Sequence, residues 1–233
     1  MPAKSAPAKR PPERERSEPL TLPVIVAAAL ELTEELGFDG LSMSILGERL
    51  GVSHMAVYHH VSGKRQLQEL VADAVLDRVE LPGSEIDDWV ERLMAHTDSF
   101  RSELVRYPGL ATFVINEHHT SDAARRLAAY TITTLLDAGF TPRDAVLGRE
   151  ALFALSPYYL TRPAVRRKPS RRRRAGGRWD PAVEEALDAA AEVTDLDRWT
   201  FGKRAVLEGL RARLEGGRPA PARPARRRPA RSA

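Results

Sequence analysis

The side chains best suited to hydrogen-bond chemistry are concentrated in one short segment of the chain. Ser53, His54, Met55, Tyr58 and His59 would share the outward face of a short helix. Hydroxyl, imidazole and phenol groups donate and accept hydrogen bonds, and methionine adds an apolar contact. Such a mixture suits the edges of bases and phosphate groups. The alternative is an ordinary helical hairpin inside a larger bundle.

The surrounding sequence predicts two short helices that would position this face. Ser42 and Ser53 stand where each helix can be capped by a side-chain oxygen. Gly51 lies between them, where a residue leaving a helix in the left-handed conformation needs no Cβ. Two helices joined by so short a turn form a helix-turn-helix. A plain hairpin needs neither two serine caps nor an exposed row of histidine and tyrosine, so DNA binding is favoured.

The run from Leu20 to Leu70 resembles the N-terminal domain of the TetR family of transcriptional regulators. The matching positions are Gly37, Leu41, Ser42, Leu50, Gly51, Val52, Ser53, Tyr58, His60 and Lys64. Later stretches are similar to the C-terminal domain of the tetracycline repressor subgroup, namely WVERLMAHTDSFRSELVRYPGLATFV, LLDAGFTPRDAVLGREALFALS and FGKRAVLEGLRARL. The resemblance implies a three-helix DNA-binding domain followed by a helical domain for ligand binding and dimerisation.

The same resemblance implies a set of residues that contact a double-stranded DNA operator. In this family the caps and the start of the second helix of the motif face DNA. The residues at these positions are Ser42, Met43, Ser44, Ser53, His54, Met55, Ala56, Tyr58, His59, His60 and Lys64. Ser44 stands where the tetracycline repressor subgroup has a base-reading arginine, so we expect a different operator sequence.

Hydrophobic spacing predicts helices along the rest of the chain. Ile25, Ala29, Leu32 and Leu36 recur at helical intervals in the first helix, which should end at Gly37. No segment alternates in the manner of a half-buried strand, so the predicted fold class is all-α. A fourth helix should run from about residue 63 to about 80, followed by helices at 84 to 106, 108 to 116, 121 to 138, 142 to 160, 180 to 193 and 196 to 214.

The larger domain in this family pairs two subunits and holds a small molecule. The resemblance implies a homodimer in which the helices at 142 to 160 and 196 to 214 form a four-helix bundle with their copies. Candidate ligand-binding residues are mostly apolar, as in most drug-sized pockets, with a few polar groups. They are His96, Phe100, Leu104, Phe113, Val114, Asn116, Tyr130, Leu152, Phe153, Tyr158 and Tyr159. The expected effector is apolar or aromatic, although packing in the core is the alternative role for each residue.

Metal and enzyme chemistry are not predicted. Val114 occupies the position of the metal-binding histidine of the tetracycline repressor subgroup, so a chelate of Mg²⁺ and drug is not the expected effector. His118 and His119 are adjacent, and no third ligand lies at a spacing that completes a site. The chain has no glycine-rich phosphate loop and no nucleophile elbow. We therefore predict no cofactor, no metal site and no enzyme activity.

Charge is distributed unevenly along the chain. The stretches 1 to 19, 162 to 178 and 216 to 233 hold 20 of the 36 basic residues and three acidic ones, a net charge of +17. The remainder holds 16 basic and 29 acidic residues, a net charge of −13. These stretches, rich in Pro, Ala and Arg, are predicted to be disordered. They would flank a DNA-binding domain at 20 to 66, with its linking helix to 80, and interrupt an effector-binding and dimerisation domain at 84 to 215.

Composition fits a globular protein with 42% hydrophobic residues. No apolar run is long enough to span a bilayer, the first residues do not form a secretory signal, and cysteine is absent, which favours the cytoplasm. The sequence therefore predicts a ligand-responsive regulator, most simply a repressor released from a palindromic operator. The alternative is an architectural or partner-binding protein that contacts nucleic acid through its basic tails and has no effector.

Overall fold

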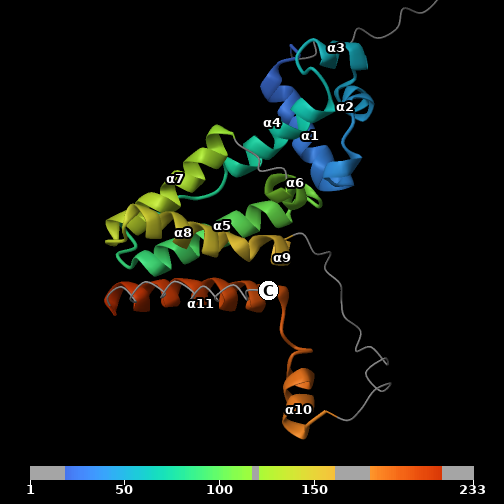
Figure 1. Cartoon of the computed structure of the whole chain (residues 1–233). Helices are drawn as coiled ribbons and strands as arrows, with labels where there is room; N and C mark the ends of the chain where they lie inside the picture. The colour runs from blue at the N-terminus through green and yellow to red at the C-terminus, as the bar shows by residue number, and fades with distance from the viewer. Residues whose placement is uncertain (1–18, 117–120, 161–178, 217–233) are drawn as a thin grey trace, which may run out of the picture.

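The computed structural model describes residues 19 to 116, 121 to 160 and 179 to 216, and the regular structure in these ranges is helical throughout. The first body consists of α1 (Leu22–Leu36), the short 3-10 helix η1 (Phe38–Gly40), α2 (Met43–Leu50), α3 (His54–Tyr58) and α4 (Lys64–Leu76). The second consists of α5 (Trp89–Val105), α6 (Leu110–Asn116), α7 (Asp122–Asp137), α8 (Pro142–Ala154), α9 (Ser156–Leu160) and α11 (Asp195–Glu215). Helix α10 (Pro181–Ala189) buries no residue and lies away from both bodies (Figure 1).

Local sequence signals explain the ends of the first helices. Helix α1 follows Thr21, whose side chain makes no capping bond, and it ends at Gly37 with a φ of 78°. The Oγ atom of Ser42 accepts a hydrogen bond from the Ile45 amide at 3.2 Å, and Ser53 caps α3 in the same way. Both predicted serine caps are confirmed.

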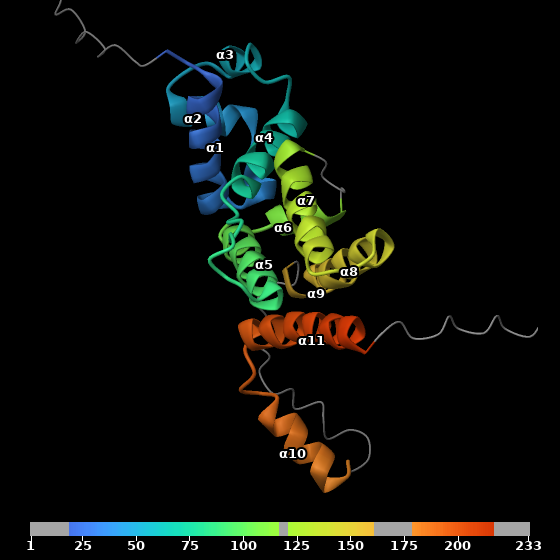
Figure 2. The same ribbon diagram turned by 90° about the vertical axis from the view of Figure 1, so that its left-hand side faces the viewer.

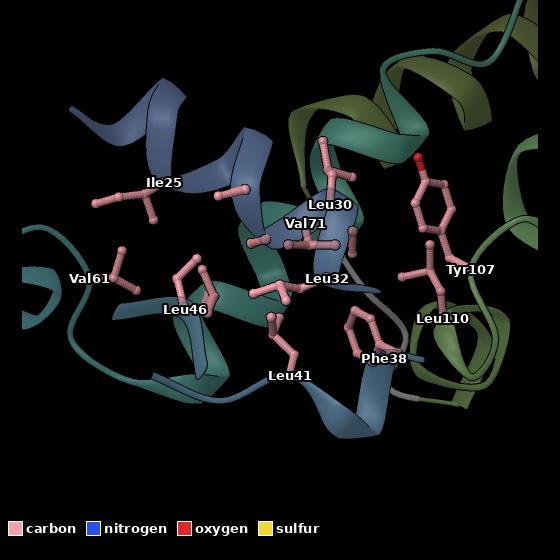
Figure 3. Close-up of a cluster of buried hydrophobic side chains, with 14 of the residues drawn as sticks. Ile25, Leu30, Leu32, Phe38, Leu41, Leu46, Val61, Val71, Tyr107 and Leu110 are labelled. Carbon is pink, nitrogen blue, oxygen red and sulfur yellow. The ribbon is translucent and has the colours of Figure 1, made fainter. Parts of the chain in front are cut away.

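The core of the first body is formed by helices α1 to α4 together with part of the second body (Figure 3). Ile25, Leu41 and Leu46 are completely buried in it. Tyr107 and Leu110, from the start of the α6 region, complete the same core. Burying each large apolar side chain stabilises the fold by roughly 1.5 to 3 kcal/mol. The two bodies therefore share one continuous apolar cluster.

Helix α11 crosses the end of the second body that lies away from α1 to α4 (Figures 1 and 2). It contacts α5, α8 and α9, while α7 packs along α8 and against α4. Two further apolar clusters fill this body. One gathers around Phe100 and Trp199, and the other around Leu152 and Leu207.

Several element boundaries differ from the predicted ones. The helix predicted at 142 to 160 is divided into α8 and α9, because Pro157 has no N–H to continue the hydrogen-bond ladder. Helix α5 begins later than residue 84, because the carboxylate of Asp88 caps it by accepting bonds from Val90 and Glu91. Helix α4 ends at Leu76, short of the predicted end near Glu80.

The predicted basic segments 1 to 19, 162 to 178 and 216 to 233 lie almost entirely outside the described residues. His118 and His119 lie outside them as well. Within the described ranges, no helix is both long and apolar enough to cross a membrane.

Candidate nucleic-acid interface and ligand-binding core

A tight turn sets the relative position of α2 and α3. Gly51 adopts the left-handed conformation, with a φ of 66°, and the Val52 amide donates to the carbonyl of Gly47 at 2.9 Å. A Cβ atom at Gly47 would lie 3.0 Å from the carbonyl oxygen of Val52 and 3.2 Å from the backbone nitrogen of His54. A side chain at this position would press on the start of α3, so glycine favours this close approach of α3 to α2.

Residues from α2, α3 and α4 converge on a surface hollow of about 410 Å³. Its lining consists of Ser42, Met43, Ser44, His54, Tyr58 and Lys64, all members of the predicted DNA-contact set. The rings of His54 and Tyr58 meet edge to face, with centroids 6.4 Å apart. This contact holds an imidazole and a phenol on one face of α3. The hollow is open, and its walls offer both donors and acceptors.

Exposure differs among the other members of the set. The side chain of Met55 is 57% exposed, and His59 and His60 are exposed beside it. Met43 is only 6% exposed and belongs to the core, while Ala56 is half-buried. Met43 can therefore offer mainly its backbone amide, at the start of α2, to an anion.

The basic side chains of this body are already engaged within it. Arg49 pairs with Glu31 at 3.4 Å and with Glu35 at 2.5 Å, and its hydrogen bond lowers the pKa of the Glu35 carboxyl. The ammonium of Lys64 donates to the carbonyl oxygen of Asp39 at 2.8 Å. Lys64 must therefore exchange this contact for a phosphate if it is to bind DNA. The described residues of this body form no unpaired positive patch that would attract a polyanion.

The second body brings several of the predicted ligand-binding residues into one aromatic cluster. Phe100 and Phe153 meet edge to face with centroids 5.5 Å apart, and Tyr159 meets Trp199 at 6.2 Å. Leu104 packs in the same cluster and is 1% exposed. These rings come from α5, α8, α9 and α11, so an aromatic compound bound among them would contact four helices.

A buried histidine, His96, and a half-buried tyrosine, Tyr130, form a polar pair in the same body. His96 is completely buried, and its Nδ1 atom lies 2.9 Å from the carbonyl oxygen of Glu80. Burial lowers the pKa of His96, so the ring is neutral near pH 7. Its Nε2 atom is buried without a hydrogen-bond partner among the described residues. The imidazole ring packs on Tyr130, with centroids 4.7 Å apart, and the Tyr130 hydroxyl donates to the carbonyl oxygen of Pro82 at 2.5 Å.

Comparison with known proteins identifies both parts of the chain. Residues 25 to 71 match the bacterial regulatory proteins of the TetR family, and residues 81 to 214 match the tetracyclin repressor-like C-terminal domain. This chain belongs to the TetR family. The class A tetracycline repressor from transposon 1721 of Escherichia coli is 32% identical over 206 residues, which cover 81% of this chain and 89% of that protein.

Solved TetR structures show the same arrangement of helices. A single-residue variant of TetR from Acinetobacter baumannii AYE, solved in complex with minocycline, superposes with a TM-score of 0.61 at 27% identity. That match covers 84% of this chain and 98% of the other. Apo ActR from Streptomyces coelicolor gives a TM-score of 0.70 at 23% identity, covering 85% and 98%, and supports the fold alone. The chain is therefore a transcriptional regulator of the TetR type, in a family of regulators rather than enzymes.

Not all predicted ligand-binding residues of this TetR-family chain lie together. The ring of Phe113 packs on Phe38 of the first body, with centroids 4.9 Å apart. Leu152 belongs to the separate cluster around Leu207, and Val114 is half-buried between the first body and the aromatic cluster. The side chains of Asn116 and Tyr158 lie outside the described residues.

Sequence reasoning missed Lys203, which points from α11 into the core of this TetR-type body. Lys203 is completely buried, and its ammonium donates to the carbonyl oxygen of Leu152 and, at 3.1 Å, to Ser156 Oγ. Burial lowers its pKa to about 7. Trp199, one turn earlier, donates from Nε1 to the Asp98 carboxylate at 2.9 Å. Lysine is rarely buried, so no sequence signal pointed to this position.

Proposed function

We propose that this TetR-family protein is a repressor that binds a palindromic operator as a homodimer and is released by a small-molecule effector. The hollow between α2, α3 and α4 is the observation that carries the proposal. There, side chains predicted to contact DNA converge on an exposed surface at the start of α3. The outward side chains of α3 would face the base edges, and the first turns of α2 and α4 the flanking phosphates.

Uncovered apolar side chains on α8 and α11 support the homodimer. Val146 and Leu147 on α8 are 43% and 48% exposed, and Phe201 on α11 is 78% exposed. Exposed apolar surface of this kind is typical of a contact with another chain. A two-fold dimer would present two copies of α3 to successive major grooves, which explains how so short a helix could select a site.

The junction between the two bodies supports an effector response. Val114 on α6 packs against both the aromatic cluster and the core of the first body. In the same region the Phe38 amide donates to the carbonyl oxygen of Pro108 at 2.7 Å. A ligand that separates the aromatic rings would therefore shift α6 and, through this contact, η1 and the helix-turn-helix. Differential affinity for the two arrangements would couple the ligand to DNA. The TetR variant from Acinetobacter baumannii was solved with minocycline, and ActR from Streptomyces coelicolor was solved with actinorhodin.

A competition footprint on genomic fragments tests operator binding. We expect one protected palindrome, whereas uniform coverage would favour the architectural alternative. Tyr58→Ala, His59→Ala and Lys64→Ala should each weaken binding by about 1 to 3 kcal/mol without unfolding the protein. Arg125→Ala is a matched control, because Arg125 is exposed on α7 and pairs with Asp122. Unchanged affinity in all three variants would contradict the proposed interface.

A thermal-shift screen of apolar and aromatic compounds tests the effector. Compounds that stabilise the protein should also weaken operator binding, by a coupling of about 1 to 3 kcal/mol. Leu104→Trp should fill the aromatic cluster and reduce this response while leaving operator affinity largely intact. Tetracycline with Mg²⁺ should have no effect, because Val114 offers no metal ligand. Stabilising compounds that never change operator affinity would contradict the allosteric part of the proposal.

A further inference from the structure

Two cationic side chains of the second body, the buried Lys203 and the half-buried Arg149, lie against the ring of Phe153. The Lys203 ammonium lies 5.4 Å from the ring centroid of Phe153, and the Arg149 guanidinium lies 5.2 Å from the same ring. Neither cation forms an ion pair with a carboxylate of the described residues. The Nε atom of Arg149 is buried without a hydrogen-bond partner there. Both cations therefore flank one ring of the aromatic cluster.

The other cationic side chains of α11, unlike Lys203, form ion pairs with carboxylates. Arg204, the next residue, forms a bidentate pair with Glu91 at 2.6 and 3.1 Å. Arg211 pairs with Asp88 at 2.5 Å. Arg204 and Arg211 are thus paired with carboxylates. The buried Lys203 has no carboxylate partner among the described residues. Buried charges in proteins are normally paired, because removing an ion from water costs several kcal/mol.

Neutral groups only partly satisfy the Lys203 ammonium. It has three N–H donors, and two of them reach the carbonyl oxygen of Leu152 and Ser156 Oγ. The Trp199 ring centroid is 4.4 Å from Nζ and provides a cation–π contact. Asp98 raises the pKa of Lys203 through its charge, but its carboxylate accepts a hydrogen bond from Trp199. Two neutral oxygens and one aromatic ring therefore surround the ammonium, and no carboxylate of the described residues accepts a hydrogen bond from it.

A structural role for Lys203 accounts for part of this geometry. Leu152 lies in the last turn of α8, where a cation stabilises the negative end of the helix. That role explains one hydrogen bond of Lys203. It does not explain the second unpaired cation at the same ring, or the unpartnered buried Nε2 of His96 in the same body.

We propose that Lys203, assisted by Arg149, anchors the carboxylate of an aromatic acid whose rings occupy the cluster formed by Phe100, Phe153 and Trp199. The inference rests on the proposed function, because it assigns the chemical class of the effector. The carboxylate of the acid would be the anionic partner of Lys203. Its aromatic rings would lie between the rings of the cluster and replace the contacts that those side chains now make with one another. A charge-assisted hydrogen bond to a buried ammonium is roughly twice as strong as a neutral one.

A pair of isosteric probes, 1-naphthoate and 1-naphthamide, tests the anchor by isothermal titration calorimetry at pH 6. The wild-type protein should bind naphthoate at least about tenfold more tightly than naphthamide, which corresponds to about 1.4 kcal/mol. Lys203→Met should abolish this preference by weakening naphthoate alone. Arg204→Met is the matched control and should retain the preference, because Arg204 is paired with Glu91 outside the core.

The wild-type comparison requires no substitution, so it stands even if Lys203→Met unfolds. Equal affinity for the two probes, failure of naphthoate to bind, or an unchanged preference in Lys203→Met would overturn the inference. Operator release by the same probes is measured in parallel. This second measurement distinguishes failure of the anion site from failure of the proposed effector response. Lys203-dependent binding of naphthoate without release would support the anion site and contradict the effector response. Release by neutral aromatic compounds, with naphthoate unbound, would overturn the anion site and support the response.

Discussion

Replacing the buried lysine should change how stability depends on pH. Burial lowers the pKa of Lys203 from its ordinary value of 10.5 to about 7. Between these two values the unfolded chain binds a proton that the folded chain has released, so the free energy of unfolding rises with pH. The cost of the buried charge is fully present below pH 7 and is relieved as the pH rises toward 10.5.

The expected magnitude follows from the size of the shift. Each unit of pKa difference corresponds to about 1.4 kcal/mol, so the whole window has a ceiling of roughly 5 kcal/mol. Between pH 6 and pH 9 the wild-type free energy of unfolding should gain about 2 to 3 kcal/mol from this residue. Lys203→Met should lack that gain. The other charged or titratable groups near the ammonium are Asp98 and His96 on α5 and Arg149 on α8, and all three remain in the variant.

Urea denaturation at pH 6, 7, 8 and 9, at one protein concentration, measures this difference. Arg204→Met is the control, because it removes a neighbouring cation that is exposed and paired with Glu91. Its pH dependence should follow that of the wild type. If the difference between wild type and Lys203→Met stays constant over this range, Lys203 does not titrate in the folded state and the reasoning is wrong.

Three further predictions concern the first body and the basic arm, which is the stretch of residues 1 to 19. Gly47→Val should abolish operator binding in a gel-shift assay but leave the dimer intact by light scattering, because its Cβ would press on the Val52 carbonyl. Phe38→Ala should lower stability in thermal unfolding by about 3 to 5 kcal/mol, since this ring is 1% exposed and packs on Phe113; a loss below about 1 kcal/mol would mean that the site collapses readily. Deleting residues 2 to 18 should weaken operator binding and flatten its salt dependence by up to about 0.9 log units per lost phosphate contact, while sequence preference persists. Identical salt slopes with and without the arm would argue against a phosphate contact.

The helix-turn-helix was predictable because its signals are local. The caps at Ser42 and Ser53 and the left-handed Gly51 each depend on residues within one turn of the chain. Spacing of apolar residues indicated the helical class, and every regular element of the described ranges is a helix. The division between α8 and α9 was also encoded, in Pro157, but the surrounding apolar residues obscured it.

Features of the second body that depend on distant contacts were not predictable. Trp199 on α11 is completely buried, whereas Phe201, two residues later, is 78% exposed. Lys203 follows them in sequence and is buried instead. Packing against α5, α8 and α9 determines which face of α11 is buried. The local sequence of α11 does not predict this face. The position of Phe113 in the first body's core also depends on a distant residue, Phe38.

The apolar core shared by the two bodies restricts which DNA-binding and ligand-binding segments of related regulators can be combined in one chain. Tyr107, Leu110 and Phe113 follow α5 in sequence, yet they complete the core around Phe38. A fragment that stops at the end of α4 would leave this apolar surface in water. A chimera that joins this DNA-binding segment to the sensor of a relative would need a matching α6 as well. A chimera designed to keep the DNA specificity of this protein and change its inducer should therefore retain α6 and the loop before it together with the DNA-binding segment.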